Sequence, residues 1–266
     1  DGVTYQINYN KNGDKTGKKI VGGEPKAIAE KKGKGLEKQG YSNVNVSDDG
    51  TLTAKDSSGN TVSLTYNSNG TKASKSISTP EGRTTAKTFD SEGRKLSNTI
   101  TEGVPGSADY KVTEAKFNAA SGAKLSHSTA TGVEGTDGYR KTSATYQIDA
   151  NGNAILDAKG KPVKDTKQII KGTPGTNAFE QVDVKYYENT GIKAQQQTIR
   201  GNENDVRNYL VSLNNYTTDG ILKDSTVKGG MQILGSDQYF ESEYFRVFDT
   251  TNDKRQVLSE STKVNV

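Results

Sequence analysis

The sequence predicts a mainly β protein, an antiparallel meander of hairpins that forms thin sandwich or elongated sheet units, with one or two short helices. Asn-Gly and Asp-Gly dipeptides recur between segments of alternating polarity, and they supply the positive φ angles of tight hairpin turns. Only 30% of the residues are hydrophobic and Trp is absent, so a thick core is excluded. The 13 Tyr residues, with recurrent Thr, Val and Ile, favour folded strands over disorder.

One hairpin pattern occurs several times. An aromatic residue is followed by Gly four positions later, and a β-branched residue follows that Gly by seven positions. The copies begin at four aromatic residues: Tyr9, Tyr66, Phe89 and Tyr216. The distance between copies is irregular, so the pattern indicates a loosely repeated meander and not a solenoid of fixed rise.

Two stretches have helical character. The first covers residues 25–39, where Pro25 suits the first turn, although Gly33 and Gly35 each cost about 1 kcal/mol inside a helix. The second covers residues 204–213. Its apolar side chains recur at the helical spacing i, i+3, i+4 and i+7, namely Val206, Tyr209, Leu210 and Leu213. We expect both helices to be short, the second packed on a sheet.

Glycine- and proline-containing stretches suggest three units. Gly-Val-Pro-Gly at 103–106 and Gly-Thr-Pro-Gly at 172–175 are typical of linkers. We therefore expect an N-terminal β-hairpin unit over 1–102, a central β unit over 103–172, and a C-terminal β unit over 173–266 that contains the helix at about 204–213.

Composition narrows the class of protein. Cysteine is absent, which excludes disulfides, thiolate metal sites and a cysteine nucleophile. No apolar run approaches the roughly 20 residues of a membrane span. The net charge of +4 is spread along the chain and predicts no nucleic-acid partner. The whole pattern favours a bacterial extracellular or cell-surface protein, and we expect any export signal or anchor to have been removed or to lie outside this fragment.

Motifs for catalysis, metals and cofactors are missing. The only histidine, His127, sits in an alternating, strand-like run without marked partners. The acidic cluster of Asp149 and Asp157 lacks the spacing of a calcium loop, and an Asn-Gly hairpin explains it better. Glycines lie inside hairpins instead of between a strand and a helix, so they do not cradle phosphates. We expect no enzyme, metal site or cofactor; a hydrolase with paired carboxylates is a distant alternative.

The densest aromatic positions are candidates for a contact surface. They are Tyr186, Tyr187, Tyr239 and Tyr244. Burial in a core is the alternative, because aromatic side chains dominate burial in a chain this poor in large apolar groups. One face of the strand around Tyr244 could pack on a sheet while the other meets a partner.

Three resemblances accompany these patterns. Residues 89–96, Phe-Asp-Ser-Glu-Gly-Arg-Lys-Leu, resemble the kernel of bacterial YD-type repeats, which implies extracellular β-hairpin sheets. The Lys-, Thr- and Gly-rich hairpins resemble the free-standing sheet of spirochaete outer-surface lipoproteins. Residues 44–64 follow a helix-like stretch and are similar to variable outer domains of flagellins and flagellar hook proteins, without the long terminal helices of that family.

Together these observations predict a non-catalytic structural or surface-display domain of a bacterial extracellular appendage or cell surface, with self-association in the appendage. The alternative is an adhesin-type module that binds a glycan or a host protein through loops or a sheet edge.

Overall fold

The structure, a computed structural model, describes residues 2–205, 208–232, 239–251 and 256–265. This part of the chain contains one α-helix, α1 (Pro25–Lys38). Its strands are β1 (Val3–Tyr9), β2 (Lys15–Gly23), β3 (Ser42–Val46), β4 (Leu52–Lys55), β5 (Thr61–Tyr66), β6 (Lys72–Ser78), β7 (Thr84–Phe89), β8 (Lys95–Glu102), β9 (Lys111–Phe117), β10 (Lys124–Thr131), β11 (Arg140–Tyr146), β12 (Lys164–Lys171), β13 (Glu180–Tyr186), β14 (Lys193–Arg200), β15 (Leu210–Tyr216), β16 (Leu222–Gln232), β17 (Tyr239–Phe248) and β18 (Val257–Asn265).

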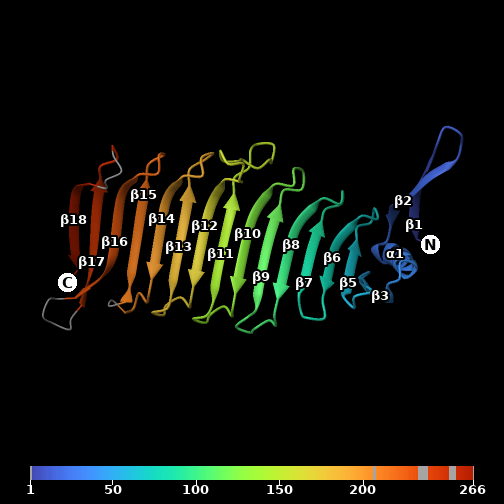
Figure 1. Cartoon of the computed structure of the whole chain (residues 1–266), viewed down its shortest axis with the longest axis horizontal. Coiled ribbons are helices and arrows are strands. Elements are labelled where there is room, and N and C mark those ends of the chain that lie inside the picture. The colour runs from blue at the N-terminus through green and yellow to red at the C-terminus, as the bar shows by residue number, and fades with distance from the viewer. Residues whose placement is uncertain (1, 206–207, 233–238, 252–255, 266) are drawn as a thin grey trace. The chain divides into compact units, whose positions relative to one another are not determined.

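The strands form an antiparallel meander. β1 and β2 make a two-stranded sheet, and β3 to β18 make an open 16-stranded sheet whose strand order is the chain order (Figure 1). The predicted fold class is confirmed, in its form of an open sheet instead of a sandwich. None of the described helices has the length and apolar character needed to cross a membrane.

By its contacts the chain divides into two compact units. The first consists of residues 1–103 and 114–123, and the second of residues 104–113 and 124–266. The three-part division expected from the sequence stays a prediction.

The hydrophobic core of the first unit lies under α1, which contacts β3, β4 and β5. Ile28 of the helix and Leu52 of β4 are completely buried there. Gly33 is buried in the same contact, and it allows the helix to lie close to the sheet. Burial also raises the pKa of the Tyr66 phenol to about 12. The helix predicted over 25–39 is confirmed, and Pro25 is at its N-terminal end, as expected.

Among the described residues of the second unit, no such core is present. Each strand from β10 to β18 makes its contacts with the strands beside it, and no helix packs on this part of the described chain. Most of its side chains are half-buried by their neighbours in the sheet, and the few buried apolar ones include Ala144 and Val184. A single layer of this kind holds together through its backbone ladder and cross-strand side-chain pairs.

Several hairpin turns are closed by side chains. Asp56 Oδ1 accepts hydrogen bonds from the backbone N–H groups two and four residues later, at 2.9 and 3.0 Å. Asp90, Asp149 and Asp157 repeat this arrangement, and Asn10 does so with its amide oxygen. A glycine with φ between 73° and 84° follows three residues after each of them. The predicted turn chemistry is therefore present.

The predicted helix over 204–213 is wrong where the structure describes its second half, because Leu210 begins strand β15. Val206 lies outside the described residues. The strand pairs with β14 on one side and with β16 on the other, so its backbone groups are satisfied along both edges. The two backbone ladders, together with the cross-strand contacts that they bring, override the local helical spacing.

The stretch at 172–175 is an ordered loop of the second unit. Residues 132–139 and 172–179 share the pattern Gly-x-x-Gly-Thr-x-x-aromatic, and the aromatic residues Tyr139 and Phe179 are buried. The N–H of Gly172 donates to Tyr139 O at 3.0 Å, and the N–H of Gly201 donates to Phe179 O at 2.9 Å. Successive loops are thus hydrogen-bonded to one another as the strands are.

Candidate functional site

Tyrosines and lysines alternate along one row of strand ends in the second unit. Tyr146, Tyr186 and Tyr216 are the last residues of β11, β13 and β15, while Lys124, Lys164 and Lys193 are the first residues of β10, β12 and β14. We call these six residues the tyrosine–lysine row. A register shift precedes each tyrosine, and beyond it Tyr146 is opposite Lys164 and Tyr186 is opposite Lys193. Irregularities of this kind re-aim side chains at the end of a strand pair.

Each lysine of the row reaches the ring of a tyrosine. The ammonium nitrogen lies 5.8 Å from the ring centre for Lys124 and Tyr146, 6.0 Å for Lys164 and Tyr186, and 5.1 Å for Lys193 and Tyr216. These distances fall within the range of cation–π attraction, which is worth about 0.5–1 kcal/mol at exposed sites. The first unit has the same arrangement, because Lys95 of β8 lies 3.6 Å from the centre of the Phe117 ring.

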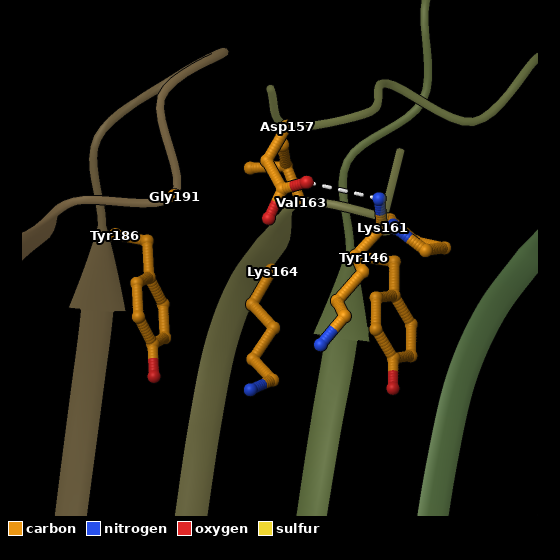
Figure 2. A pocket seen from close by; sticks show the side chains of 8 residues that line it. Tyr146, Asp157, Lys161, Val163, Lys164, Tyr186 and Gly191 are labelled. Carbon is orange, nitrogen blue, oxygen red and sulfur yellow. Dashed lines mark hydrogen bonds between the residues drawn. The ribbon is translucent and has the colours of Figure 1, made fainter. Parts of the chain in front are cut away.

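The centre of the row is a hollow of about 330 Å³. Figure 2 shows Lys164 between the side chains of Tyr146 and Tyr186, all three on the same side of their strands. Asp157 and Lys161 lie at the end of the hollow nearest the turns. Since neighbouring strands are about 4.8 Å apart, the two tyrosines, which belong to alternate strands, are separated by roughly 10 Å. Burial raises the pKa of the Tyr186 phenol.

The segment between β11 and β12 shapes this end of the hollow. Asp157 Oδ1 accepts the N–H groups of Lys159 and Lys161, each at 2.9 Å. The bond from the Lys161 N–H is the main reason why the pKa of the Asp157 carboxyl is lowered. Val163 lies at the hollow with only 2% of its surface exposed, and its N–H donates to Ile155 O at 2.8 Å.

Gln147 fastens this segment to the next hairpin. Its Nε2 donates to Lys164 O at 3.1 Å and to Tyr187 O at 3.2 Å. Its Oε1 accepts the N–H of Asn189 at 2.7 Å. One half-buried amide therefore joins the residues on both sides of the hollow. It fixes the start of β12 at Lys164 and the end of β13 at Tyr186.

The face of the sheet that carries the row is basic. Residues directly opposite each other share a face, as do alternate residues of one strand. Cationic residues placed on this face by the strand register are Arg140, Lys167, Lys171 and Arg200. Glu180 is the carboxylate among them, 2.7 Å from Lys171 Nζ and 3.1 Å from an Arg200 nitrogen. The bond from Lys171, with a further one from Arg200, lowers the pKa of Glu180.

Metal-ligating side chains do not gather among the described residues. The described residues contain no group of three histidine, aspartate or glutamate side chains that could hold a metal ion. His127 lies opposite Ala144 in the β10–β11 pair. Partial burial and the nearby Lys124 charge lower the pKa of its imidazole. The groups brought together here are donors, cations and rings, which can bind a ligand.

The predicted contact residues have different surroundings. Tyr186 lies in the hollow, whereas Tyr187 Oη donates a hydrogen bond to Tyr216 O and so joins two hairpins. Tyr244 lines a second hollow of about 310 Å³ on β16 and β17, with Val227 and Phe248. The side chain of Tyr239 lies outside the described residues. A role of these four tyrosines in contacts stays a prediction.

Sequence reasoning did not single out Tyr146, Tyr216 or the three lysines of the row as contact residues. The signal was present, because a lysine begins the strand after each of Tyr9, Tyr66, Phe89, Tyr146 and Tyr186. Each of these lysines pairs with the aromatic residue before it. What the sequence did not show is that the ammonium groups of Lys95, Lys164 and Lys193 reach an aromatic residue of the following strand.

Comparisons with known proteins do not identify a family for this chain. No protein-family model and no curated protein matches the chain. One solved structure, TcdB2-TccC3 without its hypervariable C-terminal region, is 9% identical with a TM-score of 0.25, over 98% of this chain and 14% of that chain. A second, the Photorhabdus luminescens Tc holotoxin pore, is 9% identical with a TM-score of 0.24, over 96% of this chain and 16% of that chain.

The chain thus spans less than a fifth of either toxin chain. At TM-scores this low the likeness carries no argument about the task of this chain.

Proposed function

We propose that the chain is a non-catalytic structural module, displayed on a bacterial cell surface or extracellular appendage. The observation that carries the proposal is the construction of the second unit, in which each strand contacts the strands beside it and no described helix or strand covers them as a further layer. Such a sheet grows by adding hairpins, as repeat proteins grow by adding repeats. A module that acts only through its shape and length requires no catalytic or ligand-binding site.

The composition of the sheet supports display in water. Both faces of β12 to β14 carry charged and amide side chains, for example Lys167 on one face and Asp183 on the other. Antiparallel sheets tolerate solvent in this way, whereas an enzyme needs a concave site that excludes water. A sheet with polar groups on both faces suits an exposed spacer.

Surface labelling of the source bacterium tests the proposal. Antibodies raised against this chain should label intact cells or their appendages, and external protease should remove the signal. A signal that appears only after the cells are made permeable would overturn display.

A duplication tests the structural part. Residues 180–209 comprise β13, its hairpin partner β14 and the residues that precede β15. A chain with a second copy after residue 209 should fold with more strand signal in circular dichroism and unfold cooperatively. Loss of folding would contradict a sheet built from interchangeable hairpins.

A second candidate function is recognition of a glycan. The hollow between Tyr146 and Tyr186 favours it, because flat rings flanked by charged donors are suited to the apolar and polar faces of sugars. Recognition and display are compatible, and binding to a glycan array would test this candidate.

A further inference from the structure

We propose that the tyrosine–lysine row binds a linear acidic polysaccharide, with one anionic group of the polymer at each lysine. The inference rests on the second proposed function, glycan recognition, and specifies its ligand. It does not depend on where the chain is displayed.

Charge is the first argument. In the described part of the chain, the lysines of the row form no ion pair with a carboxylate, whereas Lys171 is held by Glu180. Lys193 Nζ donates one hydrogen bond, to Gln196 Oε1 at 2.7 Å, and an ammonium group has three N–H donors. The one carboxylate at the hollow, Asp157, already accepts two backbone N–H groups. Ammonium groups with donors to spare on a basic face suit an anionic ligand.

Spacing is the second argument. Lys124, Lys164 and Lys193 begin alternate strands, so they recur at roughly 10 Å, twice the distance between neighbouring strands. The length of a disaccharide in an extended glycan chain is close to this distance. A polymer with one carboxylate in every disaccharide can therefore place successive charges at successive lysines, while its intervening sugars lie against the tyrosines.

The neighbours of the row are the third argument. Gln196 and Asn214 are opposite each other in the next position of β14 and β15, and Thr198 follows on the same face. Amide and hydroxyl groups are donors and acceptors for sugar hydroxyls. Single-stranded nucleic acid fits less well, because its phosphates recur more closely along the strand than the lysines do along the row.

The experiment measures binding of the whole chain to hyaluronan, a linear polysaccharide with one carboxylate per disaccharide. Neutral dextran and a single-stranded dT oligonucleotide are measured beside it. The test variant is Lys164→Met with Lys193→Met, which keeps an unbranched apolar stem and removes two charges. The matched control is Lys141→Met with Lys185→Met, since the register places these two lysines on the opposite face. Circular dichroism and urea unfolding establish that both variants are folded.

We expect the native chain to bind hyaluronan, more weakly as salt is added, and dextran far less. The test variant should bind hyaluronan roughly tenfold more weakly or worse, and the control variant should bind as the native chain does. No binding of hyaluronan, or equal loss in both variants, overturns the inference. Tighter binding of the dT oligonucleotide overturns it in favour of nucleic acid. Equal binding of dextran overturns the acidic ligand and leaves glycan recognition standing.

Discussion

The ammonium nitrogen of Lys193 lies 5.1 Å from the centre of the Tyr216 ring, and this contact joins the start of β14 to the end of β15. In a sheet without a second layer, contacts between neighbouring strands replace the core. The row therefore contributes to stability whether or not it also binds a ligand.

Removing this charge should destabilise the second unit modestly. Lys193→Met keeps an apolar stem but loses the cation–π attraction and the hydrogen bond to Gln196 Oε1, and we expect a loss of about 0.5–2 kcal/mol in the free energy of unfolding. Urea unfolding measures it. Lys185→Met, an exposed lysine on the opposite face, is the matched control and should change stability by less. Equal losses would mean that the ring contact contributes nothing.

Two glycines of α1 should respond in opposite ways to alanine. A Cβ at Gly35 would meet no atom within 4 Å, so Gly35→Ala should stabilise the first unit by about 0.5–1 kcal/mol, through helix propensity alone. A Cβ at Gly33 would lie 3.1 Å from Val44 Cγ1 and 3.2 Å from Leu52 Cδ1. The gain should be cancelled or reversed there. Thermal unfolding compares the two, and a larger gain at Gly33 would contradict the packing argument.

The sequence predicted the turns and the first helix because their causes are local. An Asp or Asn side chain and a glycine with positive φ close each such hairpin within five residues, as Asp157 and Gly160 do. Likewise, α1 combines an N-terminal Pro with an apolar stripe. Each feature can be inferred from the residues that form it.

The helix predicted over 204–213 failed for a non-local reason. Leu210 and Leu213 are compatible with a helical stripe, but β14 and β16 supply ladders on both sides of this segment. The tyrosine–lysine row was missed for a similar reason, since the contact of Lys164 with Tyr186 follows from which strands are neighbours in the sheet. Spacing along the chain does not show it.

A third prediction concerns the loop at 172–179. Gly172 has a φ of 69°, and a Cβ there would lie 2.6 Å from Ala178 O. Gly175 has a φ of 80° and no atom within 4 Å of its Cβ position. Gly175→Ala should therefore cost about 1–2 kcal/mol, the penalty of the left-handed backbone. Gly172→Ala should cost more, because the backbone contact must also open.

Urea unfolding of the two alanine variants separates these costs. Amide hydrogen exchange adds a local measure, since the N–H of Gly172 donates to Tyr139 O and should lose protection in Gly172→Ala only. Equal destabilisation by both substitutions would show that the close backbone contact between Gly172 and Ala178 adds no cost.

The last prediction concerns acid. Hydrogen bonds from the backbone, first from the Lys161 N–H, lower the pKa of Asp157 from its ordinary value of 3.8. A carboxyl whose pKa is lower in the folded state contributes stability that is present above its unfolded pKa and is lost as the pH falls through the folded value. The native chain should therefore lose stability on acidification below about pH 4, in part through this turn.

Asp157→Asn isolates that part. An amide oxygen can close the same turn without titrating, as Asn10 Oδ1 does by accepting the N–H groups of Asn12 and Asp14 at 2.9 Å. The variant should retain its turn and show a smaller fall in stability between neutral and acid pH. Asp219→Asn is the control, because Thr217 Oγ1 accepts the N–H of Ile221 in that hairpin. If Asp157→Asn, Asp219→Asn and the native chain all lose the same stability on acidification, protonation of the Asp157 carboxylate is not a cause of the acid destabilisation.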